Sequence, residues 1–222
     1  MAKILMVLTG ADSWTLKDGT KHPTGFWAEE AVVPYRTLRA AGHEVAVATP
    51  GGVVPTPDAG SLTGEFDAAA VDKIADFKSP LSLAEVSVAD YDAVIYPGGH
   101  GPMEDLAVDP DSGRLLTAAL TSGKPLAVVC HGPAALLAAR TPDGTSAFAG
   151  YRIAAFTNAE ETQAGFADRA QWLLQDRLEA DGLVVDVAEP WTPHVVVDRN
   201  LITGQNPMSS APLAEELLKR LA

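Results

Sequence analysis

The chain has a single cysteine, Cys130, which stands where a buried strand is expected to end. An apolar run, residues 126–129, comes before it, and His131, Gly132 and Pro133 follow. A strand that turns sharply into a helix can present a Ser or Cys side chain as a nucleophile. Gly132 leaves room for such a turn, and Pro133 suits the first turn of a helix. A helix N-terminus favours a thiolate, so we predict a reactive thiol with a lowered pKa.

Two features of this segment leave a structural interpretation open. Val128 stands at the first glycine position of the G-x-S-x-G elbow pattern. Unpaired cysteine is also among the most buried residue types, so Cys130 could be an inert apolar filler. The side chains of sequence neighbours usually diverge, and a hydrogen bond between Cys130 and His131 therefore does not follow from adjacency. His131 could equally be a structural histidine.

A second stretch with chemical potential is PGGHGP, which follows the apolar run 93–96. The amides of Gly98 and Gly99 could stabilise an oxyanion, although the pair equally suits a tight turn. His100 is a candidate substrate contact, but the turn pattern favours an exposed turn residue. The stretch lacks the G-x-G-x-x-G and G-x-x-x-x-G-K-[ST] patterns, so neither dinucleotide binding nor a P-loop is expected.

Adjacent carboxylates occur in the run WAEEAVVP. Glu29 and Glu30 cannot share one face of a helix. One of them should therefore face solvent, while the other could point into a site.

The elements that must position these residues alternate along the chain. A strand, a crossover helix and a second strand recur, which predicts a doubly wound α/β fold with a mainly parallel sheet between helices. Functional residues in such folds lie beyond the carboxyl ends of strands, which singles out residues from Thr9 onward, 97–105 and 130–133. The predicted strands are 4–8, 45–48, 93–96, 126–129 and the runs LVVDVA, HVVVD and NLITG, and the predicted helices are 28–41, 112–122, 133–139, 163–181 and 211–221.

No linker divides the chain, so residues 1–222 are expected to form one domain. The turn-rich segment 50–67 is an excursion from it, either packed on the surface or acting as a lid. Its Asp and Pro residues favour fixed turns and hence the packed arrangement.

Composition narrows the classes of function. The 222 residues are 47% hydrophobic and carry a formal net charge of −13, which opposes binding to nucleic acid and to anionic membranes. One cysteine excludes an internal disulfide, and no Cys/His cluster has zinc spacing. No apolar run is long enough to span a membrane and the N-terminus lacks a signal peptide, so a cytoplasmic location is predicted.

Taken together, these motifs resemble the DJ-1/PfpI superfamily and, within it, the Hsp31-like glyoxalase III group. The resemblance runs nearly end to end and is carried by TGFWAEEAVVP, PGGVVPTPDAGSL, YPGGHGPMED, AVVCHGPAALL, FTNAEE and TGQNPMSS. It implies a flavodoxin-like fold and commonly a homodimer. The resemblance implies that Cys130 is the nucleophile, that His131 is its acid/base partner and that Glu30 supplies the carboxyl group beside the sulfur. It further implies that the backbone amides of Gly98, Gly99 and His131 donate to an oxyanion. Either Glu160 or Glu161 would be the acidic partner of the histidine.

The function implied by the resemblance is glutathione-independent conversion of methylglyoxal, a small reactive aldehyde, to D-lactate, with no cofactor. A holdase chaperone and a protein deglycase are the alternatives, followed by a PfpI-like cysteine peptidase. An amidotransferase is disfavoured because His194 lacks an acidic residue two positions on. Glu30, His100, Cys130 and His131 could converge on an adventitious metal ion, but no required metal is predicted.

Overall fold

Seven strands form the central sheet of the computed structural model, which describes residues 1–221. Their order is β10-β11-β7-β6-β1-β4-β5, and every neighbouring pair is parallel except β10 with β11. The predicted doubly wound, mainly parallel α/β fold is therefore confirmed. The strands are β1 Lys3–Val7, β2 Ser13–Thr15, β3 Lys21–Pro23, β4 Glu44–Thr49, β5 Leu81–Ser82, β6 Ala93–Tyr96, β7 Leu126–Val129, β8 Arg152–Ile153, β9 Val184–Val185, β10 Val195–Asp198 and β11 Leu201–Gly204.

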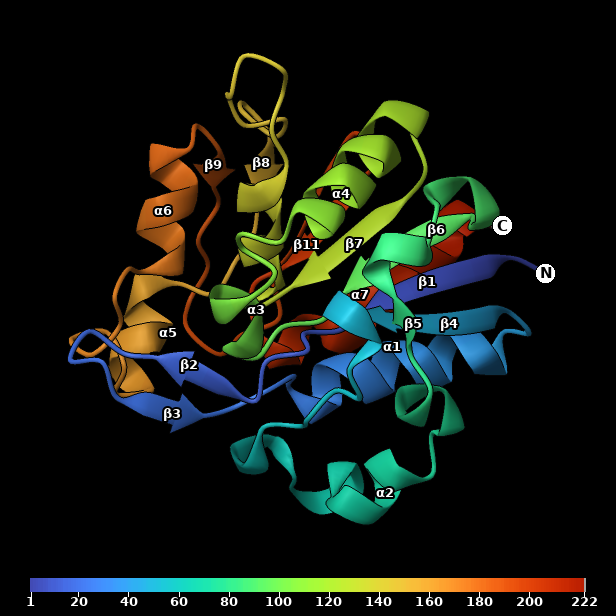
Figure 1. Ribbon diagram of the computed structural model, residues 1–222, viewed down its shortest axis with the longest axis horizontal. Coiled ribbons are helices and arrows are strands. Elements are labelled where there is room, and N and C mark those ends of the chain that lie inside the picture. Colours follow the sequence, from blue (N-terminus) through green and yellow to red (C-terminus); the bar gives the residue numbers. More distant parts are fainter. Residues whose placement is uncertain (222) are drawn as a thin grey trace.

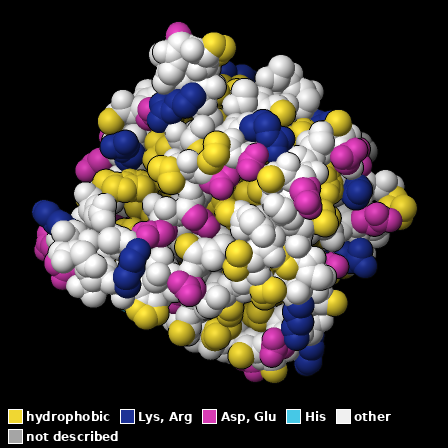
Figure 2. All heavy atoms as spheres, viewed as in Figure 1, with side chains coloured by type: hydrophobic (Ala, Val, Ile, Leu, Met, Phe, Trp, Pro, Cys, Tyr) yellow, Lys and Arg dark blue, Asp and Glu magenta, His cyan; other side chains and the backbone are white. Residues whose placement is uncertain are grey.

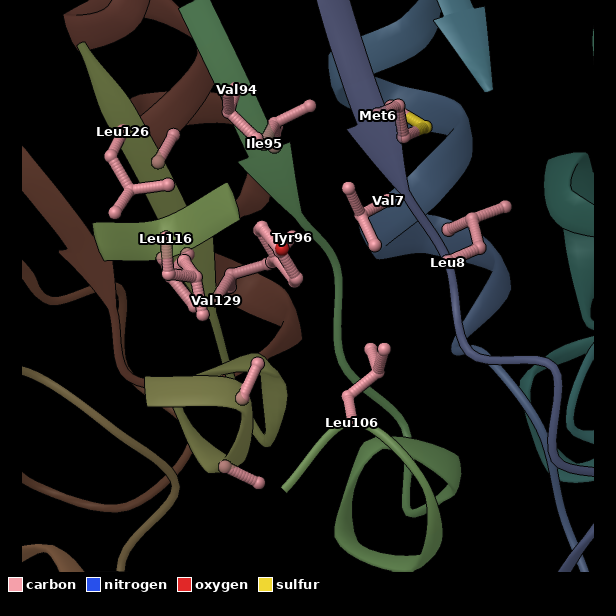
Figure 3. Close-up of a cluster of buried hydrophobic side chains, with 14 of the residues drawn as sticks. Met6, Val7, Leu8, Val94, Ile95, Tyr96, Leu106, Leu116, Leu126 and Val129 are labelled. Atoms are coloured by element: carbon pink, nitrogen blue, oxygen red, sulfur yellow. The ribbon is translucent and has the colours of Figure 1, made fainter. Parts of the chain in front are cut away.

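The middle of the sheet is apolar on both faces. Strands β6 and β7 are wholly buried, as their uninterrupted runs AVIY and LAVV require of central parallel strands. Figure 3 shows side chains of β1, β6 and β7 packed around these strands. Met6 pairs with Ile95, and Tyr96 pairs with Val128, so the three strands end at one edge of the sheet. The segments that follow β1, β6 and β7 are thereby brought together.

Helices cover both faces of the sheet (Figure 1). Helices α1 and α7 pack against each other on one face, while α4 and the 3₁₀ helix η7 lie on the other. Helix α4 begins two residues earlier than predicted, because Asp109 caps the Ser112 amide at 2.7 Å and Pro110 occupies the first turn. The helices are α1 Ala28–Ala40, α2 Ala68–Asp72, α3 Gly101–Glu104, α4 Pro110–Ser122, α5 Asn158–Gln163, α6 Leu174–Ala180 and α7 Ser210–Leu221, with η7 at Gly132–Ala138.

Only the C-terminal part of the predicted helix 163–181 forms, as α6 Leu174–Ala180. Helix α5 ends at Gln163, and Gly165 adopts a left-handed φ of 83° while the Phe166 amide donates to the Glu161 carbonyl. This closes the helix, and turns then lead to α6. The predicted helix 133–139 is a 3₁₀ helix, and only Val184–Val185 of the predicted strand LVVDVA pairs, with β8 outside the main sheet.

The segment 50–67 is packed against the chain that precedes α1. Thr24 donates its hydroxyl hydrogen bond to Asp58 at 2.6 Å, and Phe26 forms a bridge with Pro57. A Cβ atom at Gly25 would lie 1.8 Å from the Thr56 carbonyl oxygen, so the approach of the two backbones depends on glycine. The segment therefore forms a fixed wall beside the carboxyl edge of the sheet.

Side chains of both charges are interspersed with hydrophobic ones over the face drawn in Figure 2. Among the helices of residues 1–221, none has the length and apolar character needed to cross a membrane.

Candidate active site

Cys130 lies at the sharp turn between β7 and η7. Its φ is 60°, a left-handed value that non-glycine residues rarely adopt, and its amide donates to the Gly204 carbonyl. A Cβ atom at Gly132 would lie 2.5 Å from the Tyr96 carbonyl oxygen, which explains the glycine there. The thiol is only 3% exposed, yet it lines a cavity. The chain is thus bent to present the sulfur to an enclosed space.

Glu30 is the buried member of the Glu29–Glu30 pair. Its Oε2 accepts a hydrogen bond from the Gly98 amide at 2.7 Å, whereas its buried Oε1 has no hydrogen-bond partner within residues 1–221. Burial raises the pKa of Glu30 from 4.5 to about 8. Near neutral pH the carboxyl therefore mostly carries its proton.

The thiol is harder to ionise than its position before a helix suggests. Burial raises the pKa of Cys130, and the charge and hydrogen bonding of Glu30 raise it further. The prediction of a lowered thiol pKa is therefore wrong. The helix that follows is a short 3₁₀ segment, and its dipole does not offset the loss of solvation.

His131 contacts both the thiol and a carboxylate, so the two neighbouring side chains do not diverge at this bend. Its Nδ1 lies 3.4 Å from the Cys130 sulfur, and its Nε2 lies 2.7 Å from Glu161 Oε2. A carboxylate can only accept hydrogen bonds, so Nε2 carries the proton and the lone pair of Nδ1 faces the sulfur. The imidazole is arranged to take the proton of the thiol.

The protonation of the His131–Glu161 pair follows from its burial. Burial lowers the pKa of His131, with the nearby His100 adding to the effect. Burial alone would raise the pKa of Glu161, but the charge and hydrogen bonds of the two histidines hold it well below its usual range. His131 is therefore neutral near pH 7, and the ionised Glu161 accepts the hydrogen bonds of both imidazoles.

Glu160 has a different role from its neighbour. Its Oε2 accepts from the Thr157 amide and hydroxyl, closing a capping box, and its Oε1 accepts from Trp191, Gln205 and Asn206. The sequence pattern T-x-x-E marks a capping box. That pattern is present in FTNAEE. It could have assigned Glu160 to the helix cap from the sequence alone, which would leave Glu161 as the partner of His131.

His100 is buried, so the predicted exposed turn residue is wrong. Its Nε2 lies 2.9 Å from Glu161 Oε1, and its ring stacks on Trp14 with centroids 4.5 Å apart. Glu161 thus joins two imidazoles, one through each oxygen. Nothing in the turn pattern indicated this contact, because Trp14 comes from the distant β2–β3 hairpin.

The two predicted oxyanion glycines differ in availability. The Gly98 amide already donates to Glu30, which argues against it as a free donor. A Cβ atom at Gly98 would lie 2.6 Å from the backbone nitrogen of His131, so this glycine permits the turn after β6 to approach the turn after β7 closely. Gly99, with a φ of 92°, lines the cavity, and no partner for its amide is found in the described chain.

The third strand end, from Thr9 onward, is structural. Asp105 accepts hydrogen bonds from the Thr9 hydroxyl and from the Gly10 and Ala11 amides at 2.8 to 3.1 Å. These groups hold the chain after β1 and do not line the cavity.

The cavity above Cys130 has a volume of about 410 Å³ and is lined mainly by apolar and aromatic side chains. Sequence reasoning missed Trp27, Phe156, Phe166 and Trp191, since no local pattern distinguishes an aromatic residue in a pocket from one in the core. The remaining walls come from the β2–β3 hairpin, the 58–60 turn and Pro207.

One group of three residues within 1–221 has metal-ligand geometry. Atoms of His100, His131 and Glu161 lie within 4.8 Å of one another. Glu30 is not part of this group. Because both imidazole Nε2 atoms already donate to the carboxylate, a metal ion would have to displace these two hydrogen bonds.

Comparisons with known proteins assign the chain to a family. Residues 23–220 match the model of the DJ-1/PfpI family. The Staphylococcus aureus protein/nucleic acid deglycase HchA is 30% identical over 96% of this chain and 77% of its own length.

Two solved structures are similar throughout. The 24 kDa rapid encystment protein of Francisella tularensis has a TM-score of 0.89 at 27% identity, with both chains fully covered. Glyoxalase III of Candida albicans has a TM-score of 0.83 at 26% identity and covers 99% of this chain and 97% of its own. The chain is a member of the DJ-1/PfpI family, with Hsp31-like relatives.

Proposed function

We propose that the protein is a glutathione-independent glyoxalase that converts methylglyoxal to D-lactate through Cys130. The observation that carries the proposal is the placing of one cavity-lining thiol between a largely protonated carboxyl, Glu30, and an unprotonated imidazole nitrogen of His131. An acid and a base then both neighbour the nucleophile, as carbonyl addition and a subsequent proton shift require.

In the first step the thiol adds to the aldehyde carbon. His131 Nδ1 takes the proton from sulfur as the carbon–sulfur bond forms, and Glu30 gives its proton to the aldehyde oxygen. The product is a hemithioacetal, and Glu30 is left as a carboxylate. The charged Glu161 steadies the imidazolium that forms.

In the second step a proton moves between the adjacent carbons. The Glu30 carboxylate takes the hydrogen of the former aldehyde carbon, while the imidazolium protonates the ketone oxygen to give an enediol. Glu30 then delivers its proton to the second carbon, and His131 removes the hydroxyl proton of the first. Water then attacks the carbonyl carbon of the lactyl thioester and the carbon–sulfur bond breaks. The His131 imidazolium gives its proton to the leaving sulfur, and the proton lost by lactic acid as lactate returns to Glu30, so the thiol, the imidazole and the carboxyl group regain their starting states.

A protein deglycase is the second candidate, and HchA carries that name. The size of the cavity supports it, since about 410 Å³ accommodates more than a three-carbon aldehyde. The two functions share the thiol and differ in what is attached to the aldehyde carbon.

The test is lactate formation from methylglyoxal in the absence of glutathione. The wild-type protein and the exposed-site control Asp72→Asn should form lactate at the same rate. We expect Cys130→Ala to lose at least a hundredfold in kcat/KM. The proposal fails if Cys130→Ala consumes methylglyoxal as fast as the wild type.

A further inference from the structure

The cavity is much larger than methylglyoxal. Pockets of about 300–1,000 Å³ enclose drug-sized ligands, and this one measures about 410 Å³. A substrate with only a methyl group beside its two carbonyls would leave most of that space to water. The volume beyond the thiol is therefore available to a larger substituent.

Aromatic rings form the walls of that space. The centroid of the Phe156 ring lies 4.3 Å from that of His131 and 5.5 Å from that of Trp191, and the Phe156 and Trp191 rings meet edge to face. Phe166 and Trp27 contribute further apolar surface to the same cavity. Since aromatic side chains prefer offset or edge-to-face contacts with other rings, this surface complements an aryl group placed next to the reacting carbons.

Charged groups suited to a charged substituent are missing from the lining. Among residues 1–221, no Lys or Arg lines the cavity, so no permanently charged cation there pairs with a phosphate or carboxylate. Asp58 is the only acidic residue in the lining, and its two oxygens accept hydrogen bonds from Thr24 and the Gly60 amide. A neutral, apolar substituent fits these walls best.

Trp191 is held at the mouth of the cavity at a conformational cost. Its φ of 61° is unusual for a bulky residue, and strain of this kind persists only where the surroundings impose it. Here the Trp191 amide donates to the buried Glu160 carboxylate at 2.9 Å, and its indole nitrogen donates to Gln163 at 2.6 Å. Both ends of the residue are fixed, although its side chain remains partly exposed and lines the cavity.

From these observations we infer that the site takes 2-oxoaldehydes whose ketone carbon bears an aromatic or bulky apolar group, and that Trp191 determines this specificity. The inference rests on the proposed function. The chemistry is unchanged: an arylglyoxal and one water molecule give the 2-hydroxy-2-aryl acid, with the proton moved from the aldehyde carbon to the aryl-bearing carbon. No oxidant or reductant is consumed.

The first experiment compares phenylglyoxal and methylglyoxal as substrates, without glutathione. The wild type should have the higher kcat/KM for phenylglyoxal, mainly through a lower KM. Trp191→Gly, which tolerates the left-handed backbone, should lower the phenylglyoxal-to-methylglyoxal ratio of kcat/KM at least tenfold. Val187→Ala, an exposed apolar change outside the cavity lining, is the control and should leave the ratio unchanged.

A second experiment does not depend on turnover. The neutral dione 1-phenyl-1,2-propanedione should protect Cys130 from alkylation by iodoacetamide at a lower concentration than 2,3-butanedione does, and Trp191→Gly should remove the difference. Methylglyoxal turnover with no phenyl preference in either experiment would overturn the inference and leave the proposed function standing. Phenyl-selective protection without turnover of either aldehyde would support the specificity of the cavity and remove the proposed function.

Discussion

At the scale of single residues, the protonation states of Glu30 and His131 decide at which pH the site can react. Glu30 has a pKa raised to about 8 by burial, and the proposed first step uses its protonated form. His131 must be neutral to accept the thiol proton, and burial lowers its pKa below the ordinary 6.5. The reactive state therefore lies between these two titrations.

This order of titration predicts the pH profile of kcat/KM for methylglyoxal. Activity should fall as the pH rises through about 8, because Glu30 loses the proton that it gives to the aldehyde oxygen. It should also fall on the acidic side of the ordinary histidine pKa of 6.5, where His131 becomes protonated. Initial rates of lactate formation measured between pH 5 and 10 should therefore give a bell-shaped pH profile. A rate that only rises with pH would indicate that ionisation of the thiol is limiting instead.

Substituting Glu30 separates the acidity of the thiol from catalysis. Glu30→Gln removes the charge that raises the pKa of Cys130, so alkylation of the thiol by iodoacetamide should reach its midpoint at a lower pH than in the wild type. Turnover of methylglyoxal should nevertheless fall by at least a hundredfold, because an amide cannot move the proton. An unchanged alkylation profile would contradict the contact between Glu30 and the sulfur.

Substitutions of the neighbouring residues Glu160 and Glu161 should have different effects on activity and stability. Glu161→Gln should lower kcat by roughly 10²-fold through loss of the carboxylate that orients His131. Glu160→Gln should instead lower the melting temperature, because an amide nitrogen cannot accept the hydrogen bonds that the buried carboxylate receives. Lactate assays and thermal unfolding on both variants distinguish them, and the reverse pattern would exchange the assignments.

At the scale of elements, the bend after β7 depends on glycines that bring three strand ends together. Gly132→Ala would place its Cβ 2.5 Å from a backbone oxygen of Tyr96, which cannot move without disturbing β6. We expect a cost of roughly 1–3 kcal/mol in the free energy of unfolding, measured by urea denaturation. Gly10→Ala, whose Cβ would meet its nearest atom at 3.4 Å, is the matched control and should be close to neutral. Equal stability of the two variants would contradict the close approach.

Six strands of the central sheet could be predicted because they carry mainly apolar runs, whereas β5, only Leu81–Ser82, carries no such run and was missed. The ends of β6 and β7 also identified the turns at 97–99 and 130–132 correctly. The predicted helix 163–181 starts too early, because Gly165 closes α5 and α6 begins only at Leu174, a break that the apolar spacing of Trp172 and Leu178 conceals. Contacts such as Trp14 with His100 depend on how the hairpin folds back, which no local pattern encodes.

At the scale of the whole molecule, the net charge of −13 limits the substrates that can approach. A relative is named as acting on nucleic acid, yet an acidic protein repels that polymer. If this protein removes glyoxal adducts from DNA, the rate should increase as salt is raised from about 0.01 to 0.15 M, since screening weakens the repulsion. Turnover of the uncharged methylglyoxal should barely respond to salt. A DNA rate that falls with salt would instead indicate a cationic binding surface.

The homodimer remains a prediction from the family resemblance, and sedimentation at several protein concentrations would test it. The cavity is lined by residues of one chain, among them the β2–β3 hairpin, the 58–60 turn, the turn after α5 and the loop that carries Trp191. Every side chain that we place in the reaction comes from that same chain.

The most direct measurement for the central claim is mass spectrometry of the protein quenched with acid during methylglyoxal turnover. Our account predicts a covalent adduct on the Cys130 peptide, larger by one methylglyoxal molecule, that appears before lactate accumulates and is absent from Cys130→Ala. Lactate formed at the wild-type rate while Cys130 stays unmodified and dispensable would contradict it.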